Sequence, residues 1–123
     1  MLMNSDQLTQ YVVSDLTELK AMDIEVMDVR PVTDVTDYMI VASGGSHRQV
    51  LAIAENVVQR AKERGQRPLG VEGEQHREWV LVDLCDVVVH VMLPEVRALY
   101  RLEKLWGETN VGAHPGVMQE AAR

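Results

Sequence analysis

The amino-acid sequence predicts an α/β (α+β) fold: a single mixed sheet flanked by helices, in the order α-β-β-α-β-β-β-α. Three observations lead to this class. Apolar residues recur at helical spacing in three segments, and short runs rich in valine lie between them. One strand is joined to the next through a helix, which requires some parallel pairing. The chain has 123 residues, the length of one ordinary domain.

The first helix is predicted over residues 5–21, because four apolar side chains share one face at helical spacing. These side chains are Leu8, Val12, Leu16 and Leu19. Asn4 or Ser5 can cap the helix, and Gln7 is placed for a capping box with Asn4.

Two strands are predicted after this helix. Residues 24–30 form a short strand that Pro31 ends, because proline cannot donate to a sheet ladder. Residues 38–43 form a second strand, which is apolar on both faces and is therefore expected to be central in the sheet.

A turn of small residues, "SGGS" at 43–46, leads into the second helix. Ser46 and Gln49 predict a capping box, in which the serine hydroxyl accepts from the amide of Gln49 and the glutamine reaches back to the amide of Ser46. Gly65 is the expected left-handed cap at the other end. A glycine turn before a helix can also hold a phosphate, but neither the P-loop spacing nor G-x-G-x-x-G occurs here. We therefore favour capping.

Three further strands are predicted, the first from residues 67–71 and the other two as a hairpin. If Leu84 and Cys85 form its turn, Trp79 lies opposite His90, and the face behind them is nearly all valine. Cys85 disfavours a positive φ, which favours a type I turn. We expect the valine face to pack in the core, and the other face of the hairpin carries the Trp79 ring and the His90 imidazole.

A third helix is predicted over residues 94–106, starting at Pro94. Its apolar face is Val96, Leu99, Leu102 and Trp106, with Tyr100 at the edge; Arg97, Arg101 and Lys104 line another side. We expect residues 1–107 to form the single domain and residues 108–123, which show no sustained period, to form a loose C-terminal tail.

Composition and charge exclude several classes of protein. A formal net charge of −7 argues against a protein that wraps nucleic acid and suits a basic partner. No apolar run approaches the roughly 20 residues that span a bilayer, and the N-terminus does not resemble a secretory signal. The single cysteine, Cys85, cannot form an intrachain disulfide. We expect a cytoplasmic protein without a membrane partner.

No catalytic or metal-binding set is predicted. The four histidines lie in four different segments, without metal-ligand spacing. Asp83 and Asp86 flank the hairpin turn, where two carboxylates could bind a metal, although aspartate is also ordinary turn chemistry, which we favour. Nothing around Cys85 indicates a reactive thiolate. We therefore expect no metal, no cofactor and no enzyme activity.

Two long stretches carry a family resemblance. They are "TDYMIVASGGSHRQVLAIAENV" and "VEGEQHREWVLVDLCDVVVHVMLPEVRALYRLEKLW". With their Thr-Asp-Tyr strand, Trp-Val-Leu-x-Asp strand and closing Leu-Glu-x-Leu-Trp, they resemble the ribosomal silencing factor family, also called RsfS or Iojap-like. The sequence departs from the family pattern at Cys85, where glycine is usual, and at Met92, where phenylalanine is usual.

The resemblance implies a nucleotidyltransferase-like fold without known catalysis. It implies binding to the large ribosomal subunit through its fourteenth ribosomal protein, a block on joining of the two subunits, and repression of translation when nutrients are short. Tryptophan, tyrosine and arginine are the residue types that dominate protein interfaces. We therefore expect the partner-binding surface to be formed by Trp79, His90, Arg97, Tyr100 and Trp106.

Other functions stay open at this point. A nucleotidyltransferase-like enzyme would need a carboxylate pair near residues 44–46, and no D-x-D occurs. A ribosome-assembly factor that contacts ribosomal RNA is suggested by Arg97, Arg101 and Lys104, but net charge opposes it. A secondary contact with ribosomal RNA and a homodimer of the free protein stay open as well.

Overall fold

The computed structural model describes residues 3–102, and within them the order of elements is the predicted one. The helices and strands are α1 (Ser5–Glu18), β1 (Met22–Asp28), β2 (Tyr38–Ser43), α2 (His47–Glu63), β3 (Gly70–Glu72), β4 (Trp79–Asp83), β5 (Val87–Met92) and α3 (Pro94–Tyr100). Within this part of the chain, no helix is both long and apolar enough to cross a membrane. The predicted α/β class is confirmed.

The five strands form one mixed sheet in the order β1-β2-β5-β4-β3. β2 and β5 pair in parallel, and the other three pairs are antiparallel. The parallel pair is at the centre, as the apolar sequence of β2 predicts, and every residue of β5 is buried. The edge strand β3 has only three residues, and the other edge strand, β1, carries acidic side chains. Both features protect a sheet edge from pairing with other chains.

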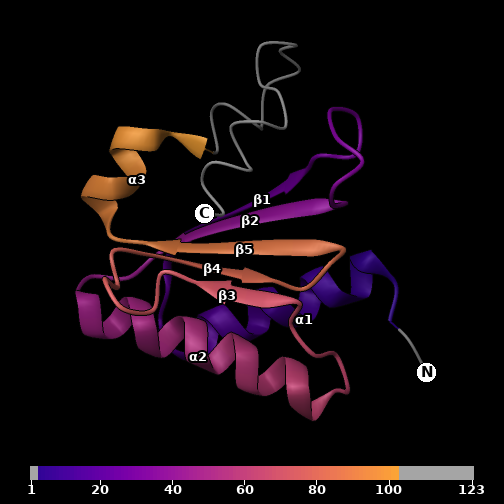
Figure 1. Cartoon of the computed structure of the whole chain (residues 1–123), viewed down its shortest axis with the longest axis horizontal. Coiled ribbons are helices and arrows are strands. Elements are labelled where there is room, and N and C mark those ends of the chain that lie inside the picture. Colours follow the sequence, from indigo (N-terminus) through magenta and orange to yellow (C-terminus); the bar gives the residue numbers. More distant parts are fainter. Residues whose placement is uncertain (1–2, 103–123) are drawn as a thin grey trace.

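The two faces of the sheet are covered differently. α1 and α2 lie together on one face, and α3 lies on the other, at the end where β5 leaves the sheet (Figure 1). The larger core cluster joins α1 and α2 to the valines of β4 and β5, which confirms the all-valine face as core. A smaller cluster lies on the opposite face, which we call the α3 face. It contains Met27, Val29, Met39, Val41, Leu81, Val88, Met92 and Leu102.

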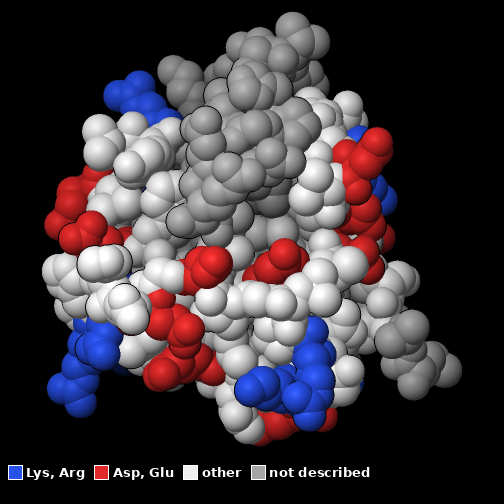
Figure 2. All heavy atoms as spheres, viewed as in Figure 1, with Lys and Arg blue, Asp and Glu red and all other residues white. Residues whose placement is uncertain are grey.

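Charged side chains are unevenly distributed over the surface. On the side shown in Figure 2, carboxylates lie across the middle of the molecule, over β3 and β4, and large basic groups lie toward the lower margin, over α2. The sequence of α2 is basic at both ends, with Arg48 near its start and Arg60 and Lys62 in its last turn. The strands β3 and β4 therefore carry the more acidic part of this side.

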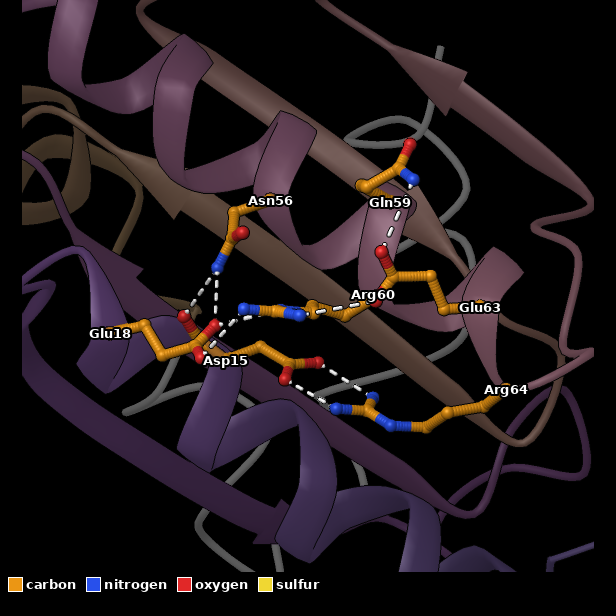
Figure 3. A network of polar contacts seen from close by, with 7 residues as sticks. All are labelled: Asp15, Glu18, Asn56, Gln59, Arg60, Glu63 and Arg64. Atoms are coloured by element: carbon orange, nitrogen blue, oxygen red, sulfur yellow. Dashed lines mark hydrogen bonds and ion pairs between the residues drawn. The ribbon is translucent and has the colours of Figure 1, made fainter.

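Polar side chains join α1 to α2 on one side of the helix pair (Figure 3). Asp15 accepts two hydrogen bonds from the guanidinium of Arg64, at 2.8 and 2.5 Å, and its side chain is only 2% exposed. Arg60 reaches Glu18 in a second ion pair that is about 40% exposed on each side. Two ion pairs therefore join α1 to α2, one with a buried carboxylate and one exposed to solvent.

Both predicted helix starts are capped. Asn4 and Gln7 form the expected capping box at α1. At α2, Ser46 Oγ accepts from the amide of Gln49 at 3.1 Å, but the glutamine oxygen accepts from Gly45, at 2.6 Å, and not from Ser46. A Cβ at Gly44 would lie 2.9 Å from the backbone nitrogen of Val50, so the sharp turn from strand to helix requires glycine there.

The predicted ends of two helices are wrong. α1 stops at Glu18 because the chain turns at Lys20, which has a φ of 62°. α3 stops at Tyr100 because Arg101 adopts a left-handed conformation, with a φ of 54°. Leu102, expected on the apolar face of this helix, lies beyond the break at Arg101 but is buried as predicted, whereas Leu99, expected on the same face, is 75% exposed. Lys104, Trp106 and the predicted tail lie outside the described residues.

The predicted hairpin register is also wrong, by two residues. Trp79 pairs with Met92, and His90 pairs with Leu81. The turn residues are Cys85 and Asp86, and Cys85 has the positive φ, 76°, that its side chain was expected to disfavour. The carboxylate of Asp83 accepts from the amide of Cys85 at 2.9 Å and so stabilises this turn.

Candidate partner-binding surface

Trp79 and His90 meet on the α3 face of the sheet. A shift of two residues keeps every side chain on its predicted face, because side chains alternate along a strand. The indole nitrogen of Trp79 donates to Nδ1 of His90 at 2.9 Å, and the ring centroids are 5.8 Å apart. The sequence therefore predicted their shared face, although they are not directly opposite each other.

His90 is inaccessible to solvent. Burial of its ring lowers the pKa of His90 to about 3, so the imidazole is neutral at ordinary pH. Because Nδ1 accepts the indole hydrogen, the ring hydrogen is assigned to Nε2, which has no hydrogen-bond partner among residues 3–102. His90 thus orients the Trp79 ring through this hydrogen bond and does not itself reach the surface.

Tyr100 extends the aromatic surface from α3. Its ring centroid lies 4.8 Å from that of Trp79 with the rings tilted by 54°, a favourable geometry for two aromatic side chains. Tyr100 is 55% exposed, and Trp79 is partly buried beside it. We call Trp79 and Tyr100 together the aromatic patch. Leu99, the residue before Tyr100, adds exposed apolar surface on the same helix.

Arg97 is buried below this surface. It is 7% exposed, and its Nη1 donates to the hydroxyl of Ser43 at the end of β2, at 3.0 Å. This contact ties α3 to the centre of the sheet. Of the five residues expected at the partner surface, the structure thus brings Trp79, His90 and Tyr100 together and buries Arg97. Trp106 lies outside the described residues.

Sequence reasoning missed a groove beside the aromatic patch. It has a volume of about 520 Å³ and lies between β3, β4 and the loop that joins them, with Trp79 and Leu81 in its lining. Three glutamates also line it, at positions 72, 74 and 78. The spacing of these glutamates around Gly73, directly before Trp79, is the signal in the sequence that could have revealed it.

Residues 3–102 form one mixed five-stranded sheet with α1 and α2 on one face and α3 on the other (Figure 1), and the aromatic patch lies on the α3 face. A family model described as "Ribosomal silencing factor during starvation" matches residues 3–123. The chain belongs to the ribosomal silencing factor family, whose members are ribosome-associated regulators of translation.

Individual relatives agree with this assignment. A protein named ribosomal silencing factor RsfS from Chromobacterium violaceum is 45% identical over 105 residues, which cover 85% of this chain and 86% of that protein. A crystal structure of a protein from the same organism is 44% identical, with a TM-score of 0.84 and coverage of 88% of this chain and 90% of the other.

A more distant relative has a different name. The protein called mitochondrial assembly of ribosomal large subunit protein 1, from Mus musculus, is 39% identical over 97 residues. The match covers 76% of this chain and 42% of that protein.

Proposed function

We propose that this protein binds the large ribosomal subunit through the subunit's fourteenth ribosomal protein, blocks joining with the small subunit, and so represses translation in the cytoplasm, for example when nutrients are limiting. Membership of the silencing factor family supports the proposal. So does the name of the mouse relative, which refers to the large subunit. A net charge of −7 suits a basic ribosomal protein better than ribosomal RNA.

The observation that carries the binding site is the aromatic patch. The tilted rings of Trp79 and Tyr100 contact each other on the face of the sheet that α1 and α2 leave free, and Tyr100 is more than half exposed. Aromatic side chains with one apolar face and one polar end are enriched among residues that dominate binding energy. His90 and Arg97 belong to the site as positioning residues, because both are buried: His90 accepts the hydrogen bond of the Trp79 indole, and Arg97 joins α3, which carries Tyr100, to Ser43 of the sheet.

Alanine substitutions separate binding from folding. We expect Tyr100→Ala to weaken binding to purified large subunits by about 2 kcal/mol, roughly thirtyfold, while its melting temperature stays close to that of the wild type. Trp79→Ala should weaken binding at least as much but also lower stability, because its ring covers His90. Sedimentation binding assays and thermal unfolding measure the two effects.

Tyr11→Ala is the matched control, because Tyr11 has similar exposure, 48%, and lies on α1, on the opposite face of the sheet. It should bind as the wild type does. If Tyr100→Ala binds like Tyr11→Ala, the aromatic patch is not the partner surface.

We also propose that the protein has no nucleotidyltransferase activity. Ser46 and Gln49 accept hydrogen bonds from backbone amides at the N-terminus of α2, and Asp83 accepts one from Cys85 in the hairpin turn. The glycine turn and Asp83 therefore both have ordinary structural roles. Purified protein should not turn over nucleoside triphosphates with magnesium or manganese. Metal-dependent turnover that disappears in Asp83→Ala or Asp86→Ala would overturn this.

A further inference from the structure

The groove beside the aromatic patch combines an apolar floor with an acidic rim. Leu81 and the ring of Trp79 contribute apolar surface, and Glu72, Glu74 and Glu78 contribute carboxylates. Its volume of about 520 Å³ is within the range of small-ligand pockets and is ample for one long side chain. Such a groove suits a ligand with an apolar stem and a cationic end.

The carboxylates of the groove have no strong cationic partner within residues 3–102. Glu72 and Glu74 form no side-chain ion pair there, and Glu78 has only His47, at 4.0 Å, with both side chains more than half exposed. Arg77, in the same loop, donates to the backbone carbonyl of Glu74 at 3.4 Å and not to a carboxylate. The negative charge of the groove is therefore available to an outside cation.

The loop that carries these carboxylates is packed closely against the Trp79 backbone. Gly73 has a φ of 92°, and a Cβ at this position would lie 2.0 Å from the carbonyl oxygen of Trp79. Only glycine permits this approach. The contact fixes the acidic loop relative to the indole, whose other edge is held by His90 at 2.9 Å. The acidic loop and the indole ring of the groove are therefore fixed relative to each other.

We propose that the groove receives an arginine side chain of the ribosomal partner, with the guanidinium against the Trp79 ring and among the three carboxylates. The proposal rests on the proposed function and names the chemistry of the contact. Arginine combines a planar cation that stacks on aromatic rings with a donor fork that matches carboxylates. A protein embedded in ribosomal RNA is rich in such cations, because they neutralise phosphates.

A charge-neutralising variant tests the groove against a matched control. The groove variant is Glu72→Gln/Glu74→Gln/Glu78→Gln, and the control variant is Glu25→Gln/Asp34→Asn/Glu55→Gln, at exposed positions outside the groove. Each variant removes three negative charges, so the net charge changes from −7 to −4 in both. Because the net charges are equal, any effect of net charge on long-range electrostatics is the same for both variants, and a difference in binding between them reports the groove itself.

Binding to purified large ribosomal subunits is measured for both variants at low and moderate salt. We expect the groove variant to bind about tenfold more weakly than the control variant, with a shallower dependence of Kd on salt. Their melting temperatures should be alike, because all six side chains are exposed. Dissociation constants within about twofold of each other would overturn the proposal.

A small probe tests the groove without the ribosome. N-acetyl-arginine amide is titrated into the wild-type protein and followed by NMR, with the uncharged N-acetyl-citrulline amide as its control. We expect shifts of the Trp79 indole and Gly73 amide signals with the arginine probe, lost in the groove variant. No shifts, or equal shifts with both probes, would contradict the groove as an arginine site. Failure of the wild type to bind large subunits would instead contradict the proposed function.

Discussion

His90 illustrates how a single residue can serve a surface that it does not reach. Its neutral ring accepts the Trp79 indole hydrogen and is closed off from solvent. A charged imidazole would carry hydrogens on both nitrogens and could no longer accept this bond. The orientation of Trp79 therefore depends on His90 staying neutral, and the low pKa caused by burial ensures that it does.

The stability of the fold should fall with acid because of His90. Its pKa drops from an ordinary 6.5 to about 3 on folding, so below pH 6.5 the unfolded chain binds a proton that the folded protein does not. Each pH unit between these values costs about 1.4 kcal/mol, or about 2 kcal/mol at pH 5. Denaturant unfolding at pH 7 and pH 5 measures this loss.

His90→Asn provides the comparison, because its amide oxygen can replace Nδ1 as acceptor and the side chain does not titrate. The variant should be less stable at pH 7, because it leaves a cavity, but should lose about 2 kcal/mol less than the wild type between pH 7 and pH 5. Equal losses in both proteins would show that His90 titrates normally.

At the scale of elements, α1 and α2 are joined by two ion pairs that differ in burial. Asp15 is almost completely covered, and the guanidinium of Arg64 lies both on its carboxylate and over the ring of Tyr11, 4.4 Å from the centroid. The Asp15 carboxylate raises the pKa of Arg64 above its ordinary range by accepting its hydrogen bonds. The pair of Glu18 and Arg60 is open to water.

Arg64→Ala should therefore destabilise the protein by about 3 kcal/mol, because it leaves the buried Asp15 carboxylate without its cation. Arg60→Ala should cost at most about 1 kcal/mol, because its partner is solvated. Denaturant unfolding of both variants at neutral pH measures the difference. Similar small losses in both would mean that Asp15 is not held as the structure has it.

The elements also show which parts of the fold the sequence could reveal. Period and capping residues predicted every helix and strand, because apolar alternation and local hydrogen bonds are encoded along the chain. The hairpin register could not be predicted, because it depends on a positive φ at Cys85, a residue type that rarely adopts one. The end of α3 could not be predicted for the same reason, because Arg101 also adopts a positive φ.

The candidate site was predictable only in part, for a related reason. Alternation along β4 and β5 placed Trp79 and His90 on one face, and this survived an error of two residues in register. Burial of Arg97 depends on Ser43, which is distant in sequence. The glutamates around Gly73 are visible in the sequence, but the shape of the groove depends on the close approach of Gly73 to the Trp79 backbone across a loop, which residue spacing alone does not reveal.

At the scale of the whole molecule, the sheet separates the face that α1 and α2 cover from the face that carries the aromatic patch. α1 and α2 complete the larger core on one face, so the aromatic patch and the acidic groove lie together at the other face and its edge. In the proposed function, this acidic protein of 123 residues acts by occupying a surface of the large subunit. Occupation of that surface is the central claim.

Reassociation of purified ribosomal subunits tests this claim most directly. The subunits are mixed under joining conditions with increasing amounts of the protein and separated on a density gradient. We predict that the joined ribosome peak falls, that the protein sediments with the large subunit alone, and that Tyr100→Ala is much less effective. Undiminished joining at saturating protein, or recovery of the protein with joined ribosomes, would contradict the account.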